Sequence, residues 1–353
     1  MTPPMPERQI DRRDLLAYVP AFLVAPQALA NAVAPQSVPA PAPAAGGVKP
    51  RPAGGKVQGE GVTIPFAMAG CWADDFGARD EIRLLAKLDS KIIVSCDKAP
   101  TNDDHSLAIL VSAGAVVQSM LMLASASMAS ATMEHPRALD MAELIQVNIS
   151  AGTVKKKPHP AAIASAVGIF ARPDATTAFD PNWKPDAETL ERIRASLIDT
   201  NITAVVIPEE AKAGLLKDLQ FLASVSPELA RSIGPSELWG EGSTVFLLGR
   251  GSNAGPQTAL MAGRVMQKAI LFSFQVAASL DARLLLPGPM EAAAATSPEH
   301  GMAAQRIAAM LLGVGFEPLA MLRMGRVLQP MARAIPPVLQ MLTPSMDSIP
   351  VAK

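Results

Sequence analysis

Short runs of β-branched and leucine residues recur along the chain, and polar segments separate them. Such runs of four to eight residues predict buried strands rather than helices. The expected strands cover residues 91–95, 145–149, 203–207, 243–248 and 319–324.

Longer apolar segments with helical spacing lie between these strands. Residues 106–131 consist almost entirely of Ala, Met, Leu, Val and Ser, so they predict a long central helix that is covered on all sides. Polar or proline-rich connections are expected at 97–104, 172–185 and 287–289. Alternating strands and helices predict an α/β fold with layered sheet and helices. The remaining predicted helices are 159–171, 186–200, 209–224, 256–280 and 299–312.

The N-terminus carries an adjacent arginine pair, Arg12 and Arg13, followed by Leu15, Leu16 and a short apolar run. This arrangement resembles a twin-arginine export signal, and prolines at 20 and 26 disfavour a stable helix there. Small residues at alternate positions offer cleavage sites, of which the one after Ala34 is favoured. We therefore expect residues 1–34 to be a signal peptide, the twin-arginine translocase to be a partner during export, and the mature protein to be periplasmic or extracellular.

A segment rich in Pro, Ala and Gly follows at 35–61 and predicts a flexible linker, because it has too little apolar surface to offset its ordering entropy. The folded domain is expected at 62–342, followed by a flexible tail at 343–353. No uninterrupted apolar stretch after residue 34 approaches the ~20 residues that span a bilayer, so no membrane span is expected after cleavage.

The formal net charge is −1, and the basic run 155–157 is short, so nucleic acid is not an expected partner. Cys71 and Cys96 could pair in an oxidising compartment, but sequence leaves this open. The four histidines are far apart and lack metal-ligand spacing, so no metal site is expected.

The glycine-rich segment 249–255 follows a predicted strand and precedes a predicted helix. Its backbone N–H groups could hold a phosphate, with Arg250 adding charge. It lacks the order of a dinucleotide or P-loop motif, however, so a plain strand-to-helix turn is the favoured interpretation. Core packing is likewise the favoured role of several methionines, although they could line a flat ligand. They stand at 120, 122, 128, 261 and 266. No nucleophile motif or acid/base pair is apparent.

Several short segments occur in the order typical of one family. They are Gly114-Ala115 through Leu123-Ala124, 170–179 with Pro181 and Pro185, 235–239, 262–268, 286–291, and 321–326 followed by Arg333. Together they resemble the nitroreductase family, specifically its FMN-binding branch with two related halves in one chain. The resemblance implies halves of about 62–165 and 166–342 and a nitroreductase-like layered sheet flanked by helices.

The same resemblance implies FMN as cofactor, with Arg172 and Arg333 as the candidates to contact its phosphate. The glycine-rich segment adds Arg250, Ser252 and Asn253 as further candidate contacts. It also implies hydride transfer through flavin to a quinone-like or nitroaromatic acceptor, which requires no catalytic side chain. The chain departs from the family where 67–88 lacks the polar motif that edges the flavin ring, and where Thr176 replaces an arginine.

Three functions therefore remain open. The leading one is an exported FMN-dependent oxidoreductase acting on a small molecule. The alternatives are a nitroreductase-fold protein that binds flavin or another ligand without catalysis, and an envelope interaction protein. The chain could act as a monomer with two halves or as a homodimer.

Overall fold

The computed structural model describes residues 63–328, except for 75, 79–80, 88–90, 97–99, 101–102, 127–128, 135–142, 151–161, 163–164, 167, 170–178, 241 and 312–314. The predicted signal peptide, linker and tail lie outside the described residues. So do Arg172, Thr176, Arg333 and most of the helix expected at 159–171.

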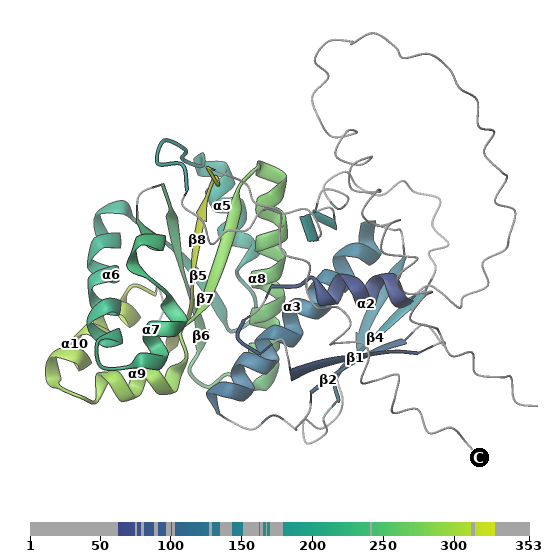
Figure 1. Ribbon diagram of the computed structural model, residues 1–353, viewed down its shortest axis with the longest axis horizontal. Coiled ribbons are helices and arrows are strands. Elements are labelled where there is room, and N and C mark those ends of the chain that lie inside the picture. The colour runs from purple at the N-terminus through teal and green to yellow at the C-terminus, as the bar shows by residue number, and fades with distance from the viewer. Residues whose placement is uncertain are drawn as a thin grey trace, which may run out of the picture. The chain divides into compact units, whose positions relative to one another are not determined.

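The described residues form two four-stranded antiparallel sheets (Figure 1). The first sheet has the order β1-β2-β4-β3 and consists of β1 (Ile82–Lys87), β2 (Lys91–Cys96), β3 (Ser130–Glu134) and β4 (Glu143–Ser150). The second has the order β5-β6-β8-β7 and consists of β5 (Ile202–Ile207), β6 (Thr244–Gly251), β7 (Ser279–Leu284) and β8 (Phe316–Gly325).

The two sheets repeat one topology. In each, a helix connects the second strand to the third: α3 (Asp104–Ala126) in the first sheet and α8 (Pro256–Ser273) in the second. A helix also precedes each first strand, namely α2 (Thr63–Cys71) and α5 (Ala187–Ser196). The α/β class and the presence of two pseudo-repeated halves in one chain are therefore confirmed.

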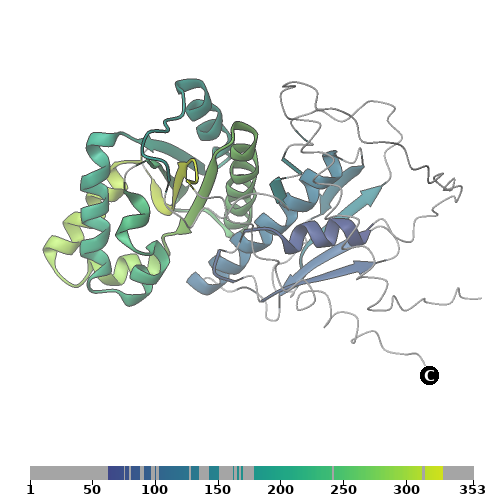
Figure 2. The ribbon, with the colours of Figure 1, turned by 45° about the horizontal axis from the view of Figure 1, so that its top comes forward.

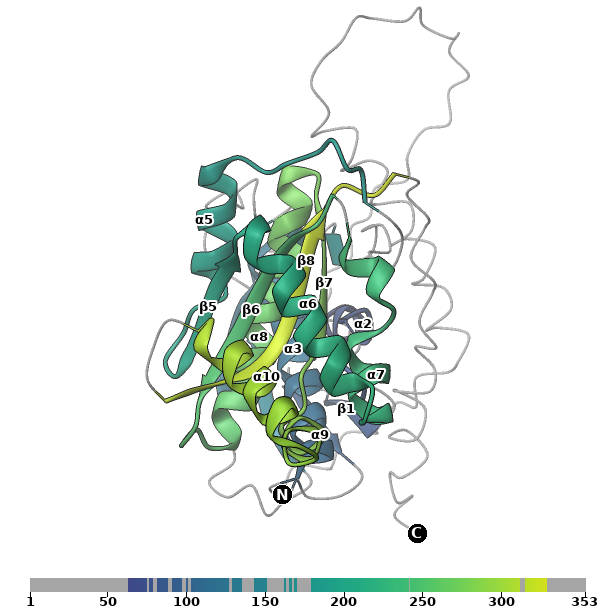
Figure 3. The ribbon, with the colours of Figure 1, turned by 90° about the vertical axis from the view of Figure 1, so that its left-hand side faces the viewer.

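The second half contains additional helices between its strands. They are α6 (Glu209–Ala223), α7 (Pro227–Ile233), α9 (Pro287–Ala294) and α10 (Pro298–Ala309), with short 3-10 turns η2 (Ser236–Trp239) and η3 (Phe274–Val276). Figure 3 shows these four helices in front of one face of the sheet, and in Figure 2 the green α8 lies on the opposite side. Their apolar faces form a core with β5, β6 and β8 that includes Leu215, Leu229, Leu247 and Ile307.

Helix α3 is long and apolar enough to cross a membrane by length and composition, but 89% of its apolar window is buried inside the protein. The predicted central helix is thus confirmed. It is shorter than expected, because Ser130 and Ala131 belong to β3. A uniformly apolar segment gives no periodic signal that marks where a helix stops.

The helices α3 and α8 cross at two glycines. A Cβ atom on Gly263 would lie 1.8 Å from the carbonyl oxygen of Val111, and one on Gly114 would lie 2.0 Å from that of Leu260. Beside this crossing, the buried Gln267 Nε2 donates to Ser119 Oγ at 3.0 Å. The two halves are therefore joined by backbones packed closely enough to require glycine at both positions.

Three further predicted boundaries were wrong. Residues 279–280, predicted to end a helix, begin strand β7, because Ala277 adopts a left-handed conformation (φ 53°) that terminates the preceding turn. The segment 287–289, expected to be a loop, opens α9, since Pro287 suits a first helical position. Residues 249–251, expected to be a turn, complete strand β6.

Candidate functional site

A cavity of about 630 Å³ lies where the N-termini of three helices meet. Its walls come from the start of α3, the end of β6, the turn before α8, and the first turns of α8 and α9. Both topological halves therefore contribute to it. The lining residues are Asp103, Asp104, Leu107, Leu110, Arg250, Ala254, Gly255, Pro256, Ala259, Pro287, Gly288 and Glu291.

The start of α8 is left open by its sequence. Pro256 in the first turn has no N–H, and the N-cap residue Gly255 has no side chain to bond the first N–H groups, although its carbonyl oxygen accepts from the Thr258 N–H at 2.9 Å. The positive end of the helix dipole is therefore available to a ligand at this wall of the cavity.

Carboxylates accept hydrogen bonds from backbone N–H groups at the starts of α3 and α9. The Ser106 N–H donates to Asp103 Oδ1 at 2.7 Å, within the first turn of α3. The Gly288 N–H donates to Asp104 Oδ2 at 2.9 Å, which ties α9 of the second half to α3 of the first. A Cβ at position 288 would lie 2.2 Å from that oxygen, so glycine is what lets the carboxylate reach the amide.

Arg250 extends from β6 and lines the cavity. Its Nε is buried and has no hydrogen-bond partner among the described residues. The guanidinium pairs only distantly with Glu317 of β8, at 3.8 Å between Nη2 and Oε2. A buried guanidinium nitrogen without an acceptor is costly, and an anionic ligand would satisfy it.

The other sequence-predicted contacts do not join Arg250. Ser252 is exposed and its Oγ donates to the carbonyl oxygen of Gly315 at 3.1 Å, while Asn253 is also exposed. Neither lines the cavity. The proposed contacts Arg172 and Arg333 lie outside the described residues.

Sequence reasoning overlooked the carboxylates of the cavity. Asp103 and Asp104 had the pattern of ordinary helix-start residues, and local sequence cannot show that Asp104 reaches a helix 184 positions away. Glu291 belongs to the segment 286–291, which the family resemblance had already singled out. Among the described residues, no group of three or more His, Cys, Asp or Glu could hold a metal ion.

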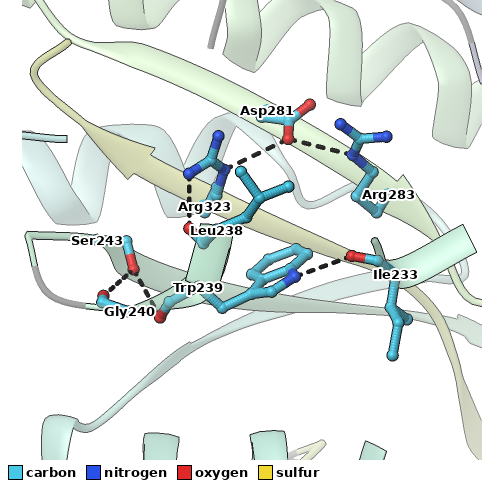
Figure 4. Close-up of polar contacts among 8 residues, drawn as sticks. All are labelled: Ile233, Leu238, Trp239, Gly240, Ser243, Asp281, Arg283 and Arg323. Carbon is cyan, nitrogen blue, oxygen red and sulfur yellow. Dashed lines mark hydrogen bonds and ion pairs between the residues drawn. The ribbon is translucent and has the colours of Figure 1, made fainter. Parts of the chain in front are cut away.

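A second polar cluster lies in the sheet of the second half (Figure 4). The fully buried Arg323 of β8 donates from Nη1 to the carbonyl oxygen of Leu238 at 2.6 Å and from Nε to Asp281 at 3.4 Å. Its guanidinium also lies 4.5 Å from the ring centroid of Phe179. Burial raises the pKa of Asp281, although Arg283 and Arg323 oppose that shift. This cluster fixes the turn η2 against β7 and β8.

No protein-family model matches the chain, and no curated protein matches it. Among solved structures, it is similar to a nitroreductase with bound FMN from Desulfitobacterium hafniense DCB-2, at 16% identity over 49% of this chain and 94% of that one, with a TM-score of 0.38. It is also similar to a nitroreductase-like protein from Streptococcus mutans, at 15% identity over 47% and 89% of the two chains, with a TM-score of 0.28. Similarity at this level does not assign the chain to a family, so the functional conclusion has to come from its own residues.

Proposed function

We propose that the protein binds FMN in the cavity at the helix N-termini and acts as a flavin-dependent oxidoreductase on a small molecule. The observation that carries this proposal is the wall formed by Arg250 and the open start of α8. There, a buried guanidinium nitrogen without an acceptor adjoins a helix end without a side-chain cap.

The size of the cavity and the wall formed by Arg250 and the α8 N-terminus fit the cofactor. A volume of about 630 Å³ lies within the ~300–1,000 Å³ typical of small-molecule sites. The phosphate of FMN carries nearly two negative charges, which the α8 N-terminus and Arg250 would stabilise. Arg172 and Arg333 remain predicted phosphate contacts.

When bound, FMN would supply the hydride chemistry, and the protein would supply position and exclusion of water. Leu107, Leu110 and Ala259 give the cavity an apolar surface. The Asp104 bond to Gly288 holds the two halves together at its edge. No side chain has to act as an acid, base or nucleophile.

A titration with FMN tests the proposal. We expect the wild-type protein to bind FMN and quench its fluorescence, and Arg250→Gln to weaken binding about 10- to 100-fold, the size expected for lost charge-assisted bonds. Arg231→Gln is the matched control, because Arg231 is exposed on α7 and its Nε donates to the Pro227 carbonyl oxygen of the same helix. Failure of the wild type to bind FMN, or equal binding by Arg250→Gln, would contradict the proposal.

A second candidate is flavin binding without turnover, which the missing ring-edge motif in 67–88 favours. The two functions differ in one assay. If the protein is an enzyme, FMN-loaded protein reduced with dithionite should be reoxidised by a benzoquinone or a nitroaromatic faster than free reduced FMN. Reoxidation slower than that of free FMN would favour sequestration.

We also propose that the protein is exported through the twin-arginine pathway. The pair Arg12 and Arg13, the short apolar run and the small residues before Pro35 support this. Replacement of both arginines by lysine should leave the full-length precursor in the cytoplasm. A processed, exported product in that double variant would argue for a different route.

A further inference from the structure

Two asparagines of the chain stand in the pattern that accepts N-linked glycans, with a hydroxyl residue two positions after the asparagine. They are Asn148, followed by Ile-Ser, and Asn201, followed by Ile-Thr. The pattern alone is common in sequences, so exposure decides which asparagine is an acceptor. In a protein that is exported already folded, a modifying enzyme outside the cytoplasm meets only side chains on the folded surface.

Asn148 is engaged within the first sheet. It belongs to β4, which pairs with β2 on one side and with β3 on the other. Its Nδ2 atom, where a glycan would be attached, donates to Glu134 Oε1 at 2.8 Å, and its Oδ1 accepts from Gln146 Nε2 at 2.8 Å. Neighbours in the sheet therefore occupy both ends of this amide, and the backbone cannot leave without breaking two strand pairings.

Asn201 lies in a tight turn between α5 and β5. Asp199 and Ile202 exchange both backbone hydrogen bonds, at 3.2 and 3.0 Å, and the two residues between them form the corner. Asn201 has a left-handed backbone (φ 61°), which asparagine tolerates better than most residues. Its carbonyl oxygen accepts the N–H of Gly251 at 2.9 Å, and the residue is exposed. The folded protein therefore presents the side chain of Asn201 to solvent on a fixed backbone.

We propose that Asn201 is the acceptor of an N-linked glycan, which rests on the export proposed above and is independent of the flavin site. The donor is an oligosaccharide on a polyprenyl diphosphate. Asn201 Nδ2 bonds to the anomeric carbon of the sugar, the bond from that carbon to the diphosphate oxygen breaks, and the proton lost from the amide balances the released diphosphate. Thr203 supplies the hydroxyl of the pattern, and Asp199 stands two positions before Asn201, as in the acceptor sequences of bacterial oligosaccharyltransferases.

Transfer to the purified, folded protein tests the acceptor. The full-length chain is incubated with a bacterial oligosaccharyltransferase and a lipid-linked oligosaccharide, and its intact mass is measured. We expect a gain of one oligosaccharide per chain, which Asn201→Asp abolishes while keeping the shape of the side chain. No gain in the wild type, or a gain that persists in Asn201→Asp, overturns the proposal. Because no export step is involved, a failure of export would count against the export pathway and not against the acceptor.

Variants of the hydroxyl residues separate the acceptor pattern from folding. Thr203→Val keeps the shape of the side chain and should abolish transfer, whereas Thr203→Ser should retain it. Ser150→Ala removes the pattern at Asn148 and is the matched control, which should still gain one oligosaccharide. Transfer to Thr203→Val, or a loss of transfer in Ser150→Ala, would contradict the assignment to Asn201.

Discussion

Replacing Gly263 by alanine should separate the two central helices. The added Cβ would lie 1.8 Å from the carbonyl oxygen of Val111 and 2.7 Å from its carbonyl carbon, whereas real Cβ contacts are essentially never shorter than 3.0 Å. The backbone atoms cannot rotate away as a side chain could, so α3 and α8 must move apart by more than an ångström. That movement would disturb the packing of the whole crossing.

The expected loss of stability follows from two opposing effects. Overpacking of a core costs about 1–3 kcal/mol, and the contact with backbone places Gly263→Ala at about 3 kcal/mol. Alanine in place of glycine favours the helix by about 1 kcal/mol, which leaves a net loss of about 2 kcal/mol. For a domain of this size the melting temperature should fall by roughly 4–8 °C.

Denaturant unfolding followed by circular dichroism measures this change. Gly214→Ala is a matched control, because Gly214 is exposed in α6 and its added Cβ would meet nothing within 4 Å. We expect this control to stabilise the protein by about 0.5–1 kcal/mol. If Gly263→Ala were as stable as the wild type, or shifted the midpoint in the same direction as the control, the close crossing of α3 and α8 would be contradicted.

The remaining predictions concern the cavity edge and the buried cluster. Gly288→Ala should displace Asp104 from the α9 amide and lower the free energy of unfolding by about 1 kcal/mol. This loss is smaller than that of Gly263→Ala, because the atom that the new Cβ meets is the end of a side chain. Equal losses in the two variants would contradict this. Arg323→Lys should lower the free energy of unfolding, measured with denaturant, by about 2 kcal/mol. A lysine cannot bond Leu238 and Asp281 and also stack on the ring of Phe179. Asp281 should make the free energy of unfolding depend on pH. Its raised pKa means that the folded protein binds the proton more tightly than the unfolded chain, so the ionised carboxylate lowers stability at neutral pH. That stability is recovered as the pH falls through the folded pKa, and fully regained below the unfolded value of about 3.9. Wild-type stability should therefore rise relative to Asp281→Asn between pH 7 and pH 4, and a constant difference between the two would be evidence against the linkage.

The sequence predicted most of the second half because its elements are marked by local chemistry. Asp186 caps α5 by accepting the Thr189 N–H, and Pro256 opens α8, as their positions in the sequence indicated. The strands β5 and β8 are apolar runs bounded by polar residues, so their existence could be predicted. Their order in the sheet could not, because strand pairing between distant segments leaves no local pattern.

The cavity was only partly predictable for the same reason. Arg250 was identified from its glycine-rich surroundings, and it lines the cavity. Ser252 and Asn253 were grouped with it because they are adjacent in sequence, but the end of β6 directs them to solvent. Asp104 reaches the cavity through a contact between the halves, which depends on the glycine at 288 and on the close crossing of α3 and α8.

An absorbance spectrum of the precursor purified from cytoplasm tests the FMN site most directly. We expect the two visible bands of oxidised flavin at near-stoichiometric amounts, with FMN released on denaturation and the bands lost in Arg250→Gln but kept in Arg231→Gln. A spectrum without these bands that added FMN does not change would mean that the cavity at the helix N-termini is not a flavin site.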